Sequence, residues 1–195
     1  MKKNKEEKYI WDLNIEPKLE LLDEEMKHYI NVCKEKLGMV PNVILANASD
    51  KDRLKNFVNF YNRLMLKEGH LSKLEREMIA VVVSSCNKCF YCLIAHGAAV
   101  RQLSKNQYLG DELMINYRSA SLNIRHKLML DFSFKLTENP SKVDNSDRNI
   151  LREAGFSEEE ILEIVEVASF FNMSNRIAAG TDMRPNAEYH NMGRE

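Results

Sequence analysis

Apolar residues recur every three or four positions through most of this chain, which is the spacing that an amphipathic helix requires. A clear example covers about residues 19–37, before Gly38 supplies a natural helix stop. Its apolar positions are Leu22, Met26, Tyr29, Ile30, Cys33 and Leu37. The 195 residues include only seven glycines and four prolines, which leaves few turns for a many-stranded sheet. We therefore predict an all-α fold.

Helix signals also divide the rest of the chain. Ser72-Lys73-Leu74-Glu75 forms a capping box, in which each end residue binds the other's backbone amide. The run Val81-Val82-Val83 is compatible with a strand, but the capping box and the lack of a partner strand favour a helix. We expect a break at 84–88. The other predicted helices cover about 51–68, 89–103, 109–118, 123–137, 146–154 and 158–179.

The length fits one domain, and no low-complexity linker divides it. We expect an N-terminal arm at 1–18, a helical domain at 19–180 and an irregular C-terminal tail at 181–195.

The formal net charge of -1 creates no field that would attract nucleic acid or an anionic membrane. No apolar run approaches the roughly 18 residues that span a bilayer. Without the apolar core of a signal peptide, the chain is predicted to be cytoplasmic.

Three of the four cysteines, Cys86, Cys89 and Cys92, fall within seven residues. A secreted disulfide scaffold spreads its cysteines along the chain, whereas a tight cluster in a cytosolic protein indicates redox chemistry or metal binding. The fourth cysteine, Cys33, is interpreted as a small core residue.

Helical spacing places three side chains on one face of a helix: Cys89, Cys92 and His96. Cys92 and His96 are one turn apart, so that the imidazole can accept the thiol proton, and the two sulfurs can join in a disulfide. A helix that begins near Cys89 favours a thiolate there through its unpaired amides and dipole. A thiolate attacks a peroxide or a disulfide, and a neighbouring thiol resolves the product. The pattern thus indicates a thiol redox enzyme.

Other interpretations remain open. A buried cysteine, a structural histidine or an incidental C-x-x-C pair would each be unremarkable alone. Cys86, Cys89, Cys92 and His96 are also four ligands for zinc or an iron–sulfur cluster, although structural zinc sites usually draw on two separated pairs. A non-catalytic metal-binding or stress-related module is therefore an alternative. Cys86 is an alternative to Cys89 as the resolving thiol, provided that the break at 84–88 turns it toward Cys92.

The segments around these residues resemble a known family. Leu74 to Ser84, followed by Asn87 to Cys92 and Ala95-His96-Gly97, is similar to the carboxymuconolactone decarboxylase / alkylhydroperoxidase D (AhpD-like) superfamily, in its peroxidase-related branch. That family's pattern is Glu, eleven residues, C-x-x-C, three residues and His. Glu77, Cys89, Cys92 and His96 match it position by position. Similar segments extend from about residue 11 to 180; among them are Gly38–Val43, Leu130–Phe132, Lys135–Thr137, Ala154–Ser157, Phe170–Asn172 and Asn175-Arg176.

The resemblance implies an all-α homo-oligomer that reduces small-molecule hydroperoxides. By that resemblance Cys92 attacks, Cys89 resolves, and His96 and Glu77 relay protons through water. Tyr91 stands where some relatives carry a histidine; a phenol is a poor base at neutral pH but can donate a hydrogen bond. The cycle needs no metal, haem or flavin. It requires an external dithiol reductant, lipoyl- or thioredoxin-like, and a general thiol–disulfide oxidoreductase is the alternative activity.

Overall fold

The computed structural model describes residues 9–194, and all regular structure within this range is helical. The prediction of an all-α fold is confirmed. The part of the predicted N-terminal arm at 1–8 lies outside the described residues. None of the described helices is both long and apolar enough to cross a membrane. The α-helices are α1 (Glu24–Leu37), α2 (Asn42–Asn47), α3 (Lys51–Tyr61), α4 (Lys73–Cys86), α5 (Phe90–Ser104), α6 (Leu109–Asn116), α7 (Ile124–Glu138), α8 (Asn145–Glu153) and α9 (Glu158–Gly180).

Three boundaries differ from the predicted ones by three residues or more. Helix α1 begins at 24 and not 19, because the Asp23 side chain accepts a hydrogen bond from the amide of Met26 and caps it there. Helix α3 ends at 61 and passes into a π-turn at Asn62–Leu66. Helix α4 continues to Cys86, so that the break before α5 covers 87–89 instead of 84–88.

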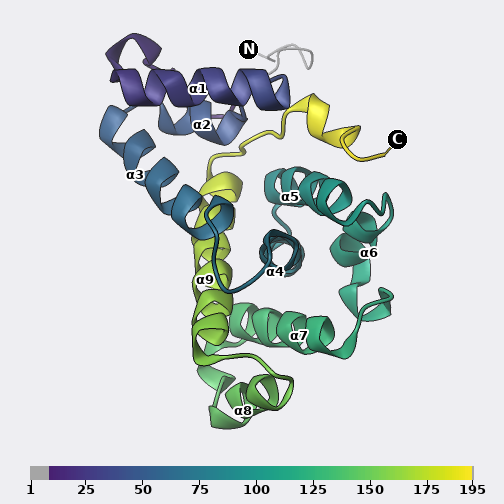
Figure 1. Ribbon diagram of the computed structural model, residues 1–195. Coiled ribbons are helices and arrows are strands. Elements are labelled where there is room, and N and C mark those ends of the chain that lie inside the picture. The colour runs from purple at the N-terminus through teal and green to yellow at the C-terminus, as the bar shows by residue number, and fades with distance from the viewer. Residues whose placement is uncertain (1–8, 195) are drawn as a thin grey trace.

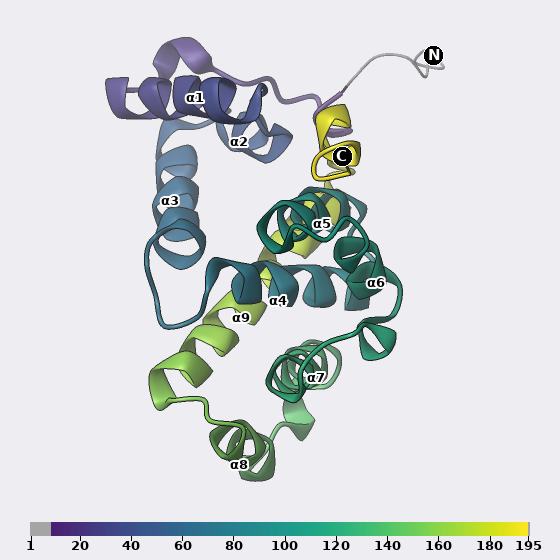
Figure 2. The same cartoon turned by 45° about the vertical axis from the view of Figure 1, so that its right-hand side comes forward.

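Helix α4 occupies the centre of the molecule. It lies between α5, α6, α7 and α9 in both views (Figures 1 and 2). Ten consecutive residues, Glu75 to Ser84, are buried on all sides of this helix. The valines at 81–83 are therefore part of a fully buried helix, and the strand alternative is wrong. The predicted capping box is confirmed: the Ser72 hydroxyl accepts from the Glu75 amide at 3.2 Å, and the Glu75 carboxylate accepts from the Ser72 amide at 2.8 Å.

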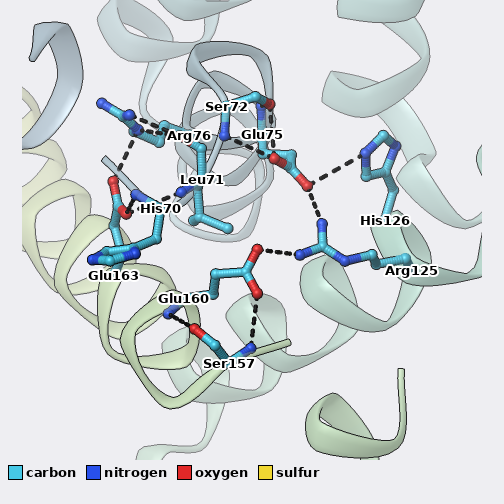
Figure 3. Close-up of polar contacts among 10 residues, drawn as sticks. All are labelled: His70, Leu71, Ser72, Glu75, Arg76, Arg125, His126, Ser157, Glu160 and Glu163. Carbon is cyan, nitrogen blue, oxygen red and sulfur yellow. Dashed lines mark hydrogen bonds and ion pairs between the residues drawn. The ribbon is translucent and has the colours of Figure 1, made fainter. Parts of the chain in front are cut away.

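Buried ion pairs hold the start of α4 against its neighbours (Figure 3). Arg76, which is 2% exposed, forms an ion pair of 2.9 Å with Glu163 of α9. It also donates to backbone carbonyls in the 64–71 segment, so its guanidinium is fully satisfied although it is buried. Arg125 of α7 bridges Glu75 of α4 and Glu160 of α9. These contacts join α4, α7 and α9.

The two ends of the described chain lie together. The amide of Arg184 donates to the carbonyl of Ile10 at 2.9 Å, and the amide of Asp12 donates to the carbonyl of Thr181 at 2.8 Å. The tail, expected to be irregular, contains a 3₁₀ turn at Ala187–His190 that contacts α5. This contact brings the tail to the surroundings of the cysteines.

Candidate functional site

The turn between α4 and α5 presents the cysteine pair. Lys88 adopts a left-handed conformation with φ of +57°, which an L-residue holds only when neighbouring contacts impose it. The amide of Cys89 then donates to the carbonyl of Ser84 at 3.0 Å, and Cys89 becomes the N-cap of α5. The helix begins within one residue of the predicted position, so Cys89 stands at its N-terminus.

The sulfurs of Cys89 and Cys92 are buried and interact with each other. A hydrogen bond from Cys92 lowers the pKa of Cys89 to about 7 against the effect of burial, with help from the amides of Cys92 and Tyr91 and from the nearby His96. The same contact, together with burial, raises the pKa of Cys92 well above its ordinary value. In the reduced pair, the negative charge is therefore favoured on Cys89 over Cys92.

Glu77 and His96 form a hydrogen-bonded pair. Glu77 projects from α4 and His96 from α5, and the distance between Oε2 and Nδ1 is 2.6 Å. The His96 ring also meets Phe171 of α9 edge to face, with 4.5 Å between centroids. A carboxylate on Nδ1 holds the proton there and leaves Nε2 free to accept another. The structure thus brings the predicted Glu77 and His96 together and orients the imidazole.

A cavity of about 670 Å³ opens beside this pair, and Cys92, His96 and Glu77 all line it. Cys89 is not among its lining residues. Cys92 therefore borders the cavity, whereas Cys89 does not. The lining combines residues of α1, α3, α4, α5 and α9 with Tyr189 and Met192 of the tail.

Several lining residues could not be recognised from the sequence. Tyr29, Tyr61 and Tyr189 contribute phenols, and Cys33 contributes a thiol. Cys33 is buried, as expected of a core residue, but it also faces the cavity, and burial raises its pKa. The one sequence feature that linked any of these residues was the spacing of Tyr29 and Cys33, which lie one turn apart on the same helix. Nothing in the sequence placed that helix at the cysteines.

Tyr91 lies between the cysteines and lines the same cavity. Its hydroxyl accepts a hydrogen bond from the amide of Val43 at 3.2 Å, and burial raises its pKa well above the usual value. The phenol is therefore protonated at neutral pH. This environment suits a hydrogen-bond donor and excludes Tyr91 as a base.

Cys86 is the last residue of α4 and does not line the cavity, and burial raises the pKa of its thiol. Over residues 9–194, no group of three or more His, Cys, Asp or Glu side chains is arranged to hold a metal ion. Cys86, Cys89, Cys92 and His96, the ligand set considered above, therefore do not converge on one point.

Comparison with known proteins places this arrangement in a family. Residues 52–107 match the model of the carboxymuconolactone decarboxylase family. An uncharacterized peroxidase-related protein from Silicibacter sp. TM1040 is 52% identical, with a TM-score of 0.92 over 97% of this chain and 98% of that one. A second uncharacterized peroxidase-related protein, described as an alkylhydroperoxidase AhpD core, comes from Ralstonia eutropha JMP134. It is 38% identical, with a TM-score of 0.91 over 96% and 98% of the two chains.

The fold also extends to more distant proteins. The debrominase Bmp8 is 18% identical, with a TM-score of 0.77 over 93% of this chain and 96% of that one, and so shares the fold alone. No curated protein matches the sequence at a significant level. Since the match at 52% identity covers nearly the whole of both chains, the chain belongs to the AhpD-like carboxymuconolactone decarboxylase superfamily.

Proposed function

We propose that this protein is a thiol-dependent hydroperoxide reductase that uses Cys89 and Cys92 as a dithiol. One observation carries the proposal: Cys92 and the Glu77–His96 pair line the same cavity, while Cys89, which interacts with Cys92, is outside the lining. The names of the two similar proteins, both peroxidase-related, support the same activity.

The first step takes place at Cys92. His96 accepts the proton of this thiol, directly or through a water molecule, while Glu77 stabilises the imidazolium. The thiolate attacks the terminal oxygen of the hydroperoxide, so that an S–O bond forms and the O–O bond breaks. The departing alkoxide takes the proton back from His96 and leaves as an alcohol. Cys92 is then a sulfenic acid.

The second step resolves this intermediate. The Cys89 thiolate attacks the Cys92 sulfur, the two residues form a disulfide, and hydroxide leaves and is protonated to water. The peroxide has gained two electrons and the two thiols have lost them. An external dithiol, lipoyl- or thioredoxin-like, must reduce the disulfide to close the cycle. No bound cofactor takes part.

The cavity also indicates the kind of peroxide. Its volume of about 670 Å³ exceeds what hydrogen peroxide needs, and apolar and aromatic side chains make up most of its wall. We therefore propose small organic hydroperoxides with an apolar body as substrates. The proposed setting is a cytoplasmic homo-oligomer that binds neither nucleic acid nor membrane.

The decisive experiment is stoichiometric oxidation of the reduced protein by cumene hydroperoxide, followed by peptide mass mapping. We expect one Cys89–Cys92 disulfide per chain. Cys89→Ser should stop at a sulfenic acid on Cys92, and Cys92→Ser should not react. Cys86→Ser is the matched control, because Cys86 lies outside the cavity, and it should behave as the wild type. A sulfenic acid that forms on Cys89, or a Cys86–Cys92 disulfide, would contradict these roles.

A general thiol–disulfide oxidoreductase is the second candidate, favoured by the low pKa of Cys89 at a helix N-terminus. The two activities differ in their oxidant. Rapid reduction of a disulfide probe by Cys89, with no reaction toward cumene hydroperoxide, would replace the first proposal with this one.

A further inference from the structure

The cavity beside the cysteines has a buried end and an exposed mouth. Cys92 and Phe171, at the buried end, are each 1% exposed. The mouth consists of the lining residues whose side chains are exposed: Lys36, Leu37, Leu66, Lys73, Gln102 and Leu103. A molecule that enters the cavity from solvent therefore passes these residues before it reaches the sulfur.

Two of the six residues at the mouth are cations. Lys36 belongs to the last turn of α1, and Lys73 is the first residue of α4. Within the described part of the chain, the lysines that form ion pairs are Lys27, Lys55 and Lys135. Neither lysine at the mouth therefore has an acidic partner there, and both ammonium groups are available to an anion from solvent.

The lining also contains a carboxylate, but that group is already bound. Glu77 stands one turn after Lys73 on α4, where a pair of opposite charges could form. Its Oε2 instead contacts His96 Nδ1 at 2.6 Å, and no ion pair joins it to the lysine. The free charge at the mouth is therefore positive, and a cleft lined by charge of one sign attracts ligands of the opposite sign.

The lysines and the reactive groups lie at different depths of the cavity. A helix rises about 1.5 Å per residue, so Gln102 at the mouth is roughly 15 Å along α5 from Cys92. On α4, Lys73 is about 6 Å along the axis from Glu77. Apolar residues make up most of the wall between the two ends. This arrangement suits an elongated apolar molecule that has a reactive group at the buried end and a negative charge at the mouth.

We propose that Lys36 and Lys73 form an anion-binding subsite at the mouth, which holds the carboxylate of an elongated, otherwise apolar hydroperoxide, as in a hydroperoxide of a fatty acid. The inference rests on the proposed function and narrows its substrates to hydroperoxides that carry an acidic group. The carboxylate binds the two ammonium groups, the hydrocarbon chain lies along the apolar wall, and the peroxide group reaches Cys92 and His96. The redox step itself is unchanged.

Binding tests the subsite without any peroxide chemistry. Isothermal titration calorimetry at low ionic strength compares octanoate with 1-octanol, which share an apolar chain but differ in charge. We expect the ratio of the octanoate affinity to the octanol affinity to fall about five- to tenfold in the double variant Lys36→Gln/Lys73→Gln, because two ion pairs at a partly exposed site are lost. Added salt should weaken the binding of octanoate to the wild type more than that of octanol.

The matched control is Lys34→Gln/Lys67→Gln, which removes the same number of charges. Both of these lysines are exposed, and neither lines the cavity. The control should retain the wild-type ratio of affinities, and circular dichroism should show that both double variants fold. An equal ratio in the two double variants would overturn the inference, since the charge at the mouth would then have no specific effect.

Kinetics extend the test to the substrate. The hydroperoxide of linoleic acid and that of its methyl ester, each below its micelle-forming concentration, differ in the carboxylate alone. We expect the ratio of their kcat/KM values, acid to ester, to fall about five- to tenfold in Lys36→Gln/Lys73→Gln, mainly through KM, and to stay unchanged in the control. An unchanged ratio in both would overturn the inference. A protein that binds octanoate through the two lysines but reduces neither hydroperoxide would contradict the proposed function alone.

Discussion

At the scale of single residues, Cys89 and Cys92 differ in what surrounds each sulfur. Because the hydrogen bond from Cys92 lowers the pKa of Cys89 to about 7, alkylation of Cys89 in the reduced wild type should rise with pH through about 7 and then level off. Below that pH the rate should fall about tenfold per unit, as the thiolate fraction does. Cys92→Ala removes the hydrogen-bond donor, so the midpoint of the Cys89 alkylation profile should move to higher pH, toward that of an ordinary thiol. A wild-type midpoint near 9 would contradict this assignment.

The pair formed by Glu77 and His96 supports a second prediction at this scale. Glu77→Gln preserves the size of the side chain but removes the charge that stabilises the imidazolium. We expect the rate of Cys92 oxidation by cumene hydroperoxide to fall by roughly a hundredfold or more, as expected for the loss of an acid–base group. Glu112→Gln, at an exposed site on α6, should leave the rate unchanged. Equal rates in the two variants would show that Glu77 has no part in proton transfer.

At the scale of helices, α5 and α6 approach closely because glycines face each other. A Cβ atom on Gly110 would lie 2.6 Å from the carbonyl oxygen of Gly97. Gly110→Ala must therefore push the helices apart and should lower the free energy of unfolding by about 1–3 kcal/mol. Gly180→Ala, at the end of α9 with no atom within 4 Å of the new Cβ, should be neutral or slightly stabilising. Thermal unfolding by circular dichroism compares the two, and equal melting temperatures would refute the close approach.

The start of α4 supports a prediction about pH. Although burial acts in the opposite direction, hydrogen bonds from His126 and Ser72 and the charge on Arg125 lower the pKa of Glu75 to about 2. The ordinary pKa of a glutamate is 4.5, so the contribution of Glu75 to stability is present above that pH and is lost as the pH falls through about 2. The contribution should be on the order of 2 to 3 kcal/mol.

Urea unfolding between neutral pH and pH 2 tests this contribution. The free energy of unfolding of the wild type should decrease as the pH falls below about 4.5. That of Glu75→Gln should be lower at neutral pH and should change less with pH. If the free energy of unfolding depends on pH equally in both proteins, Glu75 is not the group responsible for the loss of stability in acid.

At the scale of the whole molecule, Arg101 connects α5, the helix that begins at the cysteine pair, to the tail. Its guanidinium is 2% exposed and donates to the carbonyls of Tyr189 and Met192, two residues that line the cavity. Arg101→Met should release the tail, raise hydrogen exchange at 186–193, and increase the KM for cumene hydroperoxide more than that for hydrogen peroxide. Arg194→Gln removes an exposed ion pair with Asp111 and should change little. Unchanged exchange in Arg101→Met would mean that the tail is held by other contacts.

Local features of the sequence predicted a large part of this protein. The apolar spacing, the Ser72–Glu75 capping box and the Gly38 stop act within one or two helical turns, so the helices could be placed to within a few residues. The spacing of Glu77, Cys89, Cys92 and His96 also identified the residues that the α4–α5 turn brings together. The exceptions were two boundaries where a cap or a π-turn overrode the periodicity, at Asp23 and at Asn62–Leu66, and the short helix α2, which was not predicted.

The cavity around these residues could be seen only in the tertiary structure. Tyr29 and Cys33 from α1 and Tyr189 from the tail reach the cavity because distant helices cross there, and no local pattern specifies that crossing. The direction in which Asn175 points likewise follows from contacts between α9 and the end of α4. The helices and the reactive groups could be predicted from the sequence, since both depend on neighbours along the chain. The cavity, and the cysteine that faces it, depend on contacts between segments far apart in the chain.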